Sequence, residues 1–267
     1  MQHELETAEA IAREAGELVM GYYRGDFQVD LKNETEPVTE ADRVANNHIV
    51  RRLREEFPQD AIIAEESTNE AAAAEGVRRV WMVDPMDGTK EFIKHTDEFA
   101  VMIGLAVEGR PQLGVVNQPA TRTLYRGIVG DGAESDIDGK VSAMKVSDRA
   151  TPADLRLICS RSHLPDVVQK IMEDLGITEM VRSGSVGLKI GRIATQSCDL
   201  YLHPSIGTKL WDACAPEAIL AAAGGALTDF DGNPVKYDPA HLHNVRGLLA
   251  SNGAIHAELA ERLRGYY

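Results

Sequence analysis

The feature that most constrains this chain is an apolar run that ends directly in two acidic residues. Val80 to Val83 is predicted to form a buried strand, and it leads into Asp84, Pro85, Met86, Asp87, Gly88 and Thr89. Pro85 fixes its own φ and favours extended backbone at Asp84, so a stiff segment holds the two carboxylates. Gly88 lets the backbone approach a neighbour closely, and Thr89 places a hydroxyl beside it.

Two interpretations of this stretch stay open on the residues alone. Carboxylates about 4 Å apart repel by roughly 1 to 4 kcal/mol, depending on the local dielectric. A divalent cation would remove that cost, and oxygen ligands suit Mg²⁺. The alternative is a surface turn, because Asp, Pro and Gly are the common turn residues.

The whole stretch resembles a known metal-binding signature. Asp-Pro-Met-Asp-Gly-Thr (84–89) is similar to that of the inositol monophosphatase superfamily, the magnesium-dependent, lithium-sensitive phosphomonoesterases. The continuation Lys90-Glu91-Phe92 resembles the 3′(2′),5′-bisphosphate nucleotidase branch, whereas inositol monophosphatases proper usually continue with Thr-Asn-Phe. Met86 departs from the usual Leu or Ile of the signature, which does not matter if only its carbonyl binds the metal.

Composition narrows the class of partner and the compartment. With 267 residues and a net charge of −14, the chain is unsuited to nucleic acid or an anionic membrane surface as its main partner. The same charge suits a phosphate-binding enzyme only if bound metal ions reverse its sign locally. The 3 cysteines show no C-x-x-C spacing, and the N-terminus reads as a charged helix without an apolar signal region. We therefore expect a cytoplasmic protein.

The first half is predicted to hold two more acidic site residues. An amphipathic helix is expected over residues 4 to 23, and a second helix follows Thr39, with Asp42 placed as in a capping box. The short apolar strand 61–64 leads into Glu65 and Glu66, and an acidic pair at a strand end is common. The resemblance implies more: Asp42 would partner Thr89 beside the metals, and Glu65 would be a third carboxylate of the site.

The order of elements predicts two unlike halves. Apolar runs 99–107, 112–118 and 123–129 read as antiparallel strands, with the two helices packed on one side of the sheet, and 131–145 as a last hairpin and linker. From residue 155 strands alternate with helices, including a helix over 166–175. We expect an α/β protein with an α+β domain (1–147) and an α/β domain (148–267). The resemblance implies the layered αβαβα sandwich of the sugar phosphatases.

The second half supplies another acidic motif. Trp211-Asp212-Ala213-Cys214-Ala215-Pro216 precedes an apolar helical run, and Pro216 is tolerable only in a first turn, which places Asp212 at or next to the N-cap. A capping aspartate is therefore one interpretation. The other is carried by resemblance: Trp-Asp-x-x-Ala-Pro-Glu is similar to the superfamily's second signature, whose aspartate is a metal ligand.

Two short segments bear on the substrate. Ser160-Arg161-Ser162-His163 leaves a strand, and Ser183-Gly184-Ser185 opens a helix that carries Lys189 one turn in. A second phosphate needs fixed positive charge away from the metals, for which the candidates are Arg161, His163, Lys189 and Lys209. An ordinary strand end and helix start is the alternative. In the bisphosphate nucleotidases, which both segments resemble, the corresponding serine, histidine and lysine hold the nucleotide.

The resemblance spans about the whole chain and implies a complete site. The expected ligands of two or three Mg²⁺ ions are Glu65, Asp84, Asp87, Asp212 and the Met86 carbonyl, with Glu66 for a weaker third ion. The expected catalytic residues are Asp42, Glu65 and Thr89. The expected substrate-binding residues are Met86, Gly88, Thr89, Ser160, His163, Ser185, Lys189 and Asp212.

The implied activity is hydrolysis of the 3′-phosphate of adenosine 3′,5′-bisphosphate to give AMP. One alternative is an inositol- or fructose-phosphate phosphatase of the same superfamily, and another is a metal- or nucleotide-binding regulatory protein without catalysis. The expected partner is a small phosphomonoester, with no nucleic acid and no membrane. A homodimer is compatible with the resemblance.

Overall fold

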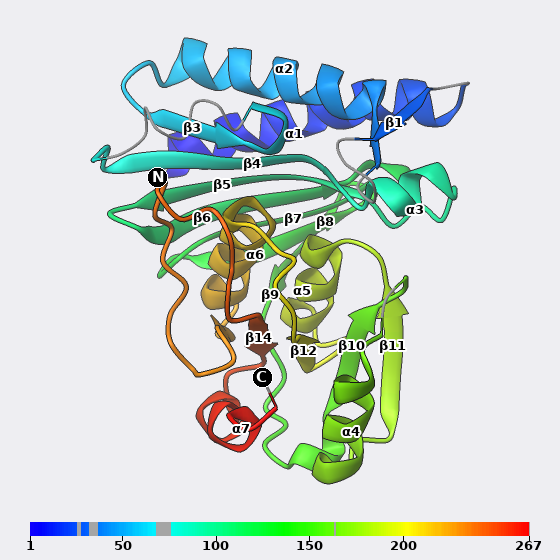
Figure 1. Cartoon of the computed structure of the whole chain (residues 1–267). Helices are drawn as coiled ribbons and strands as arrows, with labels where there is room; N and C mark the ends of the chain where they lie inside the picture. Colours follow the sequence, from blue (N-terminus) through cyan, green and yellow to red (C-terminus); the bar gives the residue numbers. More distant parts are fainter. Residues whose placement is uncertain (26–27, 32–36, 68–75, 163, 267) are drawn as a thin grey trace.

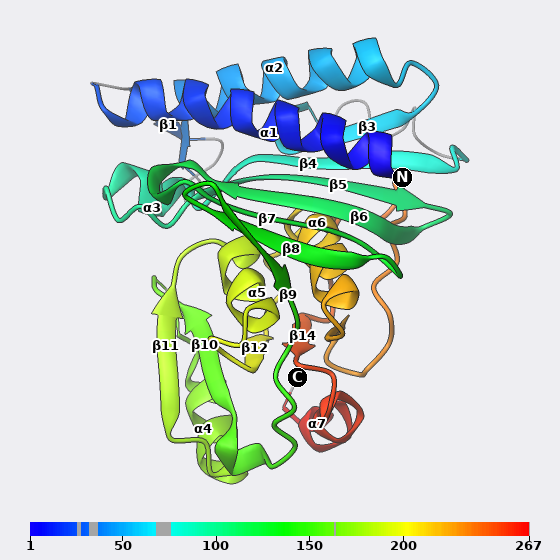
Figure 2. The ribbon, with the colours of Figure 1, turned by 180° about the vertical axis from the view of Figure 1, so that it is seen from behind.

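The protein is a stack of five layers, helix–sheet–helix–sheet–helix, in a computed structural model (Figures 1 and 2). The structure describes residues 1–25, 28–31, 37–67, 76–162 and 164–266. The sequence predicted this layered α/β arrangement, and the structure confirms it.

The first half builds the upper sheet and the helices above it. Its helices are α1 (Gln2–Tyr23), α2 (Glu40–Glu56) and α3 (Thr89–Ile93). Its strands are β1 (Val29–Leu31), β2 (Pro37–Thr39), β3 (Ala61–Ala64), β4 (Arg79–Asp87), β5 (Ala100–Val107), β6 (Arg110–Gln118), β7 (Thr123–Ile128), β8 (Gly132–Ile137) and β9 (Lys140–Met144). Strands β3 to β9 form one sheet in sequence order, parallel between β3 and β4 and antiparallel elsewhere.

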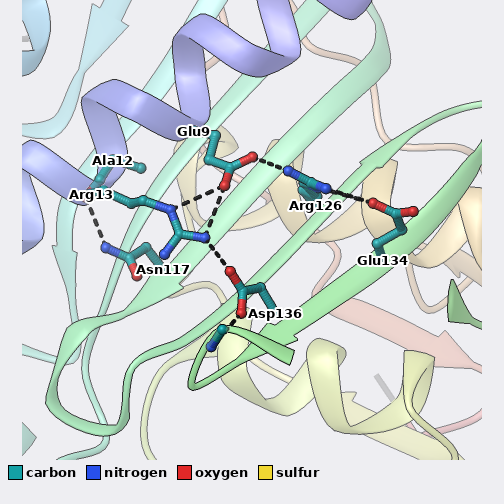
Figure 3. A network of polar contacts seen from close by, with 8 residues as sticks. Glu9, Ala12, Arg13, Asn117, Arg126, Glu134 and Asp136 are labelled. Carbon is teal, nitrogen blue, oxygen red and sulfur yellow. Dashed lines mark hydrogen bonds and ion pairs between the residues drawn. The ribbon is translucent and has the colours of Figure 1, made fainter. Parts of the chain in front are cut away.

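Helices α1 and α2 cover one face of this sheet, as the periodicity of their apolar residues predicts. A polar network also ties α1 to the sheet (Figure 3). Arg13 donates to Asp136 on β8 across 2.7 Å and to Glu9 on its own helix across 2.9 Å. Arg126 on β7 bridges Glu9 and Glu134. This network links α1 to strands β7 and β8 in addition to the apolar packing.

The opposite face of the same sheet is covered by helices from the second half. These are α5 (Val186–Ala194) and α6 (Leu210–Ala222), which lie between the two sheets in both views (Figures 1 and 2). A Cβ on Gly114 would lie 2.1 Å from the Ala215 carbonyl oxygen, and one on Gly104 would lie 2.6 Å from the Ala215 backbone nitrogen. These glycines therefore let α6 rest directly on strands β5 and β6.

This packing bears on two predictions. The prediction that the two N-terminal helices pack on one side of the first sheet is confirmed by α1 and α2, and the opposite face, which one apolar cluster joins to α5 and α6, is covered by the second half. The predicted domain boundary at residue 147 stays a prediction. The chain does pass from the first sheet to the second between β9 and the next strand. Helices α5 and α6 of the second half nevertheless share a hydrophobic core with the first sheet.

The second half completes the stack with a mixed sheet and an outer helix layer. Its strands are β10 (Arg156–Ser160), β11 (Glu179–Ser183), β12 (Leu200–His203), β13 (Ala226–Thr228) and β14 (Leu248–Ser251), in the order β11-β10-β12-β14-β13. Helices α4 (Asp166–Leu175) and α7 (His256–Leu263) pack beneath it. Among the described residues, each helix is too short or too polar to span a membrane.

Candidate metal centre and substrate pocket

Three carboxylates from both halves meet between the first sheet and helix α6. Asp84 and Asp87 lie at the end of β4, Asp212 lies in the first turn of α6, and one oxygen from each lies within 4.8 Å of the others. Burial raises the pKa of all three, and repulsion from neighbouring carboxylates raises that of Asp84 and Asp212 further, to about 8 for Asp212. Oxygen donors held together against their own repulsion are the donor set that Mg²⁺ prefers, so the residues fit such an ion.

The geometry of β4 explains how two acids come to lie side by side. The predicted strand end at Val83 is wrong: β4 continues to Asp87, and its register against β5 shifts between Asp84 and Asp87. The Asp84 carboxylate accepts a hydrogen bond from the Met86 N–H across 2.9 Å. A surface turn is excluded too, because Asp84 is 1% exposed and Met86 is also 1% exposed. A bulge in a buried strand therefore aims both carboxylates into the site.

Asp212 reaches the cluster from the start of α6. Its carboxylate accepts a hydrogen bond from the N–H of Lys209, the N-cap, across 2.6 Å, so it caps the helix from the third helical position. We predicted Asp212 at or next to the N-cap, because proline is tolerated in the first turn of a helix. The helix instead begins at Leu210, so that Pro216 lies inside it. Pro216 gives up the bond that a residue there would donate to the carbonyl four residues earlier.

Asp42 does two things at once. One oxygen accepts hydrogen bonds from the Thr39 N–H across 2.7 Å and the Thr39 hydroxyl across 2.6 Å, which confirms the predicted capping box. The other oxygen accepts a hydrogen bond from the Thr89 hydroxyl across 3.0 Å. Asp42 is fully buried, and burial raises its pKa despite these bonds. The interpretations as a cap and as the partner of Thr89 are therefore both correct.

Glu65 and Glu66 follow β3 next to the cluster. The negative charge of Glu65 contributes to the raised pKa of Asp42, Asp84 and Asp212, which places it within electrostatic reach of all three. Gly88 has a φ of +102° at the start of α3, and a Cβ there would lie 2.8 Å from the Glu98 carbonyl oxygen, so this position requires glycine.

A cavity of about 220 Å³ adjoins the cluster between the two halves. Asp87 and Gly88 form the wall that it shares with the cluster, and Ser160, Ser185 and Lys189 line it from the second half. The remaining wall is largely apolar, with side chains of Leu164, Pro165, Val168, Leu202 and Pro204. His163 lies outside the described residues.

Lys189 is the buried cation that faces this cavity, which the exposed Lys90 also lines. It is 4% exposed, and its Nζ lies 5.2 Å from the centre of the Tyr201 ring. Within the described part of the chain, no hydrogen bond or ion pair reaches Nζ. Burial lowers the pKa of Lys189, and the charges of Asp87 and Glu91 act in the opposite direction.

Other predicted substrate contacts are already engaged. The Ser185 hydroxyl donates to Asp87 across 2.6 Å and accepts the Leu188 N–H across 3.2 Å, so it positions Asp87 and caps α5. Arg161 is paired with Glu98 across 2.5 Å, and Lys209 contacts His243 across 3.1 Å. Of the three cation candidates in the described residues, only Lys189 faces the cavity.

Glu98 was not among the predicted site residues, because its partners Arg161 and Gly184 lie 63 and 86 residues away in the sequence. Glu91 was noticed only as part of the resemblance, yet it accepts a hydrogen bond from Ser162 across 2.6 Å. Contacts of this range have no periodic signal in the sequence.

Comparisons with known proteins bear on the family and the fold of this chain. The sequence profile of the inositol monophosphatase family matches residues 1–266. The "3′(2′),5′-bisphosphate nucleotidase CysQ" of Escherichia coli K12 is 35% identical over 232 residues, which is 86% of this chain and 92% of that protein. The solved CysQ of Bacteroides thetaiotaomicron superposes with a TM-score of 0.80 at 30% identity, covering 94% of this chain and 98% of that one.

Inositol monophosphatases proper have the same architecture. The solved enzyme from Anabaena (Nostoc) matches with a TM-score of 0.78 at 28% identity, covering 99% of this chain and 96% of that one. The match of the family profile over nearly every residue and the agreement in fold lead to one conclusion. This chain belongs to the inositol monophosphatase family.

Proposed function

We propose that this protein is a Mg²⁺-dependent phosphomonoesterase that hydrolyses the 3′-phosphate of adenosine 3′,5′-bisphosphate. The oxygen of a water molecule forms a bond to phosphorus, the bond between phosphorus and the ribose 3′-oxygen breaks, and that oxygen takes up a proton. The products are AMP and inorganic phosphate. The relatives named as bisphosphate nucleotidases support the substrate class.

The acidic cluster supports the metal requirement. Asp84, Asp87, Asp212 and Glu65 would hold the ions together with the Met86 carbonyl, and Glu66 would serve a weaker third ion. When bound, Mg²⁺ neutralises phosphate charge and lowers the pKa of water. Full turnover after exhaustive chelation would rule this proposal out, and inhibition by Li⁺ is expected from the family resemblance.

The Thr89–Asp42 pair would handle the proton of the attacking water. Because the Thr89 hydroxyl donates to Asp42, its oxygen is left to accept a hydrogen bond from the water. As the water attacks, Thr89 takes its proton and passes its own to Asp42, whose raised pKa suits a base. Glu65 would assist in deprotonating this water.

The observation that carries the choice of substrate is the buried Lys189 ammonium in the cavity beside the cluster. A buried ammonium that lacks a hydrogen bond or ion pair is costly, and a second phosphate would supply both. The apolar wall of the cavity suits a nucleobase. Inositol phosphate, whose surface consists of hydroxyl groups, would make few apolar contacts with it. Both features favour a nucleotide bisphosphate.

A phosphate-release panel tests the proposal directly. Adenosine 3′,5′-bisphosphate, inositol 1-phosphate and fructose 1,6-bisphosphate are offered at equal concentration with Mg²⁺. We expect the nucleotide to give the highest kcat/KM. A preference for either sugar phosphate would assign the protein to that activity instead, and no release from any of them would favour a regulatory protein.

Lys189→Met should impair the hydrolysis of bisphosphates but not of monophosphates, because methionine keeps most of the length of the side chain and removes its charge. The KM for adenosine 3′,5′-bisphosphate should rise roughly 10- to 100-fold, as expected for a lost hydrogen bond to a charged group. Hydrolysis of adenosine 3′-monophosphate should change far less. Lys170→Met, on the outer helix α4, is the control. Equal losses on both substrates would remove the main support for a nucleotidase.

Metal binding should release protons at neutral pH. Asp212 has a pKa of about 8 without metal, so at pH 7 its carboxyl is mostly protonated and must lose the proton to become a ligand. The apparent affinity for Mg²⁺ should therefore rise from pH 6 to about pH 8 and level off above. Calorimetry in two buffers of different ionisation enthalpy measures the released protons, with Asp212→Asn as the control. An affinity that is constant over this range would contradict the assignment.

Each of the two predicted domains would supply part of the site. Residues 1–147 would supply most metal ligands and the Thr89–Asp42 pair, and residues 148–267 would supply Asp212 and Lys189. A cytoplasmic location and a homodimer stay predictions.

A further inference from the structure

Glu98, which lies just before strand β5, holds two loops of the second half. Its carboxylate accepts hydrogen bonds from Arg161 Nε across 2.5 Å and Nη2 across 2.7 Å, and from the backbone N–H of Gly184 across 2.8 Å. Arg161 belongs to the loop after β10, and Gly184 belongs to the loop that opens α5. One side chain of the first half therefore fixes both loops that lead into the cavity.

The Glu98 carboxylate is ionised and fully engaged in hydrogen bonds with these two loops. The Glu98 side chain is 12% exposed, and burial by itself would raise its pKa. The hydrogen bonds from Arg161 and Gly184 outweigh burial, so the pKa of Glu98 is lowered and the group stays ionised. A bidentate guanidinium contact with a further backbone donor is among the strong, directional arrangements of a carboxylate.

The backbone at Gly184 packs closely against Glu98 and Glu91. A Cβ on Gly184 would lie 2.5 Å from the Glu98 carbonyl oxygen and 2.5 Å from Glu91 Cγ. Glu91 also accepts the Ser162 hydroxyl across 2.6 Å. The two acids therefore clamp the loops from one side, and the absence of a side chain at residue 184 lets the halves approach this closely.

The clamped segment connects the carboxylate cluster to Lys189. Directly after Gly184, the Ser185 hydroxyl and the Gly187 N–H both donate to Asp87, across 2.6 and 3.0 Å. Lys189 follows in the first turn of α5, the helix that Ser185 caps. The position of residues 184–187 therefore sets the distance between the cluster and the Lys189 ammonium.

We propose that Glu98 is a positioning residue that sets the spacing between the metal-binding carboxylates and Lys189, and thereby the selectivity for bisphosphates over monophosphates. The inference rests on the proposed function. A monophosphate needs only the cluster, whereas a bisphosphate must reach both ends at once. A displacement of about 1 Å can cost roughly 100-fold in a site that depends on such alignment.

The test measures kcat/KM for adenosine 3′,5′-bisphosphate and for adenosine 3′-monophosphate in the full-length protein with Mg²⁺. Glu98→Ala should lower the ratio of the two values by about 10- to 100-fold. Glu98→Gln, which keeps one oxygen for the Gly184 N–H, should lower it less. Glu108→Gln is the matched control, because it also breaks a pair with an arginine, Arg78, at an exposed turn of the first sheet.

A second readout does not depend on turnover. AMP keeps the remote phosphate, so the difference between its binding and that of adenosine in excess chelator, measured by calorimetry, reports on the Lys189 end of the cavity without the metals. We expect Glu98→Ala to weaken AMP binding towards that of adenosine, with melting close to that of the wild type. Arg161→Ala should weaken it less, because Glu98 still holds Gly184.

The outcomes separate this inference from the proposed function. A wild-type protein that does not prefer the bisphosphate overturns both. A wild-type preference that survives unchanged in Glu98→Ala overturns the positioning role alone, as does an equal fall on both substrates. Tighter AMP binding by Glu98→Ala would also overturn it, because it would mean that Glu98 restrains Arg161 from binding the phosphate.

Discussion

Asp84→Asn is expected to abolish phosphatase activity while stabilising the protein in the absence of metal. Asp84 is buried at the centre of the acidic cluster, where burial and the charges of Glu65, Asp87 and Asp212 raise its pKa. The amide removes a charge that the metal ions need as a ligand and that the metal-free fold must accommodate at a cost. At about 4 Å each unrelieved repulsion is worth roughly 1 to 4 kcal/mol.

The pH dependence of this effect has a definite sign. A raised pKa means that the folded state holds more protons than the unfolded state, so the stability of the metal-free wild type falls as pH rises above the ordinary Asp value of 3.8. The gain from Asp84→Asn should therefore be small at pH 5 and largest at pH 9. Chemical denaturation in chelator at both pH values measures it.

Magnesium gives the complementary measurement for Asp84→Asn. The wild type should gain stability when Mg²⁺ is added, whereas the variant should gain little, because binding to the folded state stabilises it by mass action. Asp60→Asn is a control carboxylate away from the cluster, where Asp60 accepts hydrogen bonds from Arg79 and Trp81. A variant that loses helical signal along with activity would show that Asp84 is needed for folding.

Thr89→Ala should lower kcat by roughly 10²- to 10⁴-fold, the usual contribution of acid–base catalysis, with little change in KM. The reason is geometric. The Thr89 hydroxyl lies 3.0 Å from Asp42 and 3.3 Å from the Met86 carbonyl, between the buried base and the cluster. Alanine leaves the cluster and Lys189 in place, so substrate should still bind. Initial rates over a range of substrate concentrations separate the two parameters.

The double variant decides the role of Asp42. Asp42→Asn should cause a loss of similar size, and Thr89→Ala with Asp42→Asn should be little worse than either alone, because the pair acts as a unit. If the two losses multiply instead, Asp42 serves only as the cap of α2. Thr96→Ala, whose hydroxyl donates to the Glu91 carbonyl across 3.3 Å, is the control for losing a half-buried threonine.

The local part of this structure could be predicted from the sequence because its signals are local. The bounds of α4 follow from apolar spacing over residues 166–175, and the capping box at Thr39 and Asp42 lies within four consecutive residues. The motifs around Asp84 and Asp212 predicted both residues as ligands of one metal site, through their resemblance to the two family signatures. The structure brings those two residues and Asp87 together.

The misplaced features depend on packing between distant segments. β4 runs through Pro85 because the strand bulges against β5, and Pro85 by itself argues for the end of the strand. Pro216 lies inside α6 because the helix begins at Leu210, earlier than its proline suggests. Arg161 was predicted as a candidate phosphate ligand. The sequence does not show that Glu98 forms an ion pair with it.

The close seating of α6 on the first sheet also bears on how the chain matures during synthesis. The face of that sheet covered by α1 and α2 can close early, because both helices precede most of its strands. The other face must wait for residues 186–222, and α6 brings Asp212 with it. A nascent chain that has completed only its first sheet therefore exposes a broad apolar surface and lacks a full metal site. Such contacts between distant segments slow folding and favour aggregation, so the ribosome-bound first half is the stage at which a chaperone would be most needed.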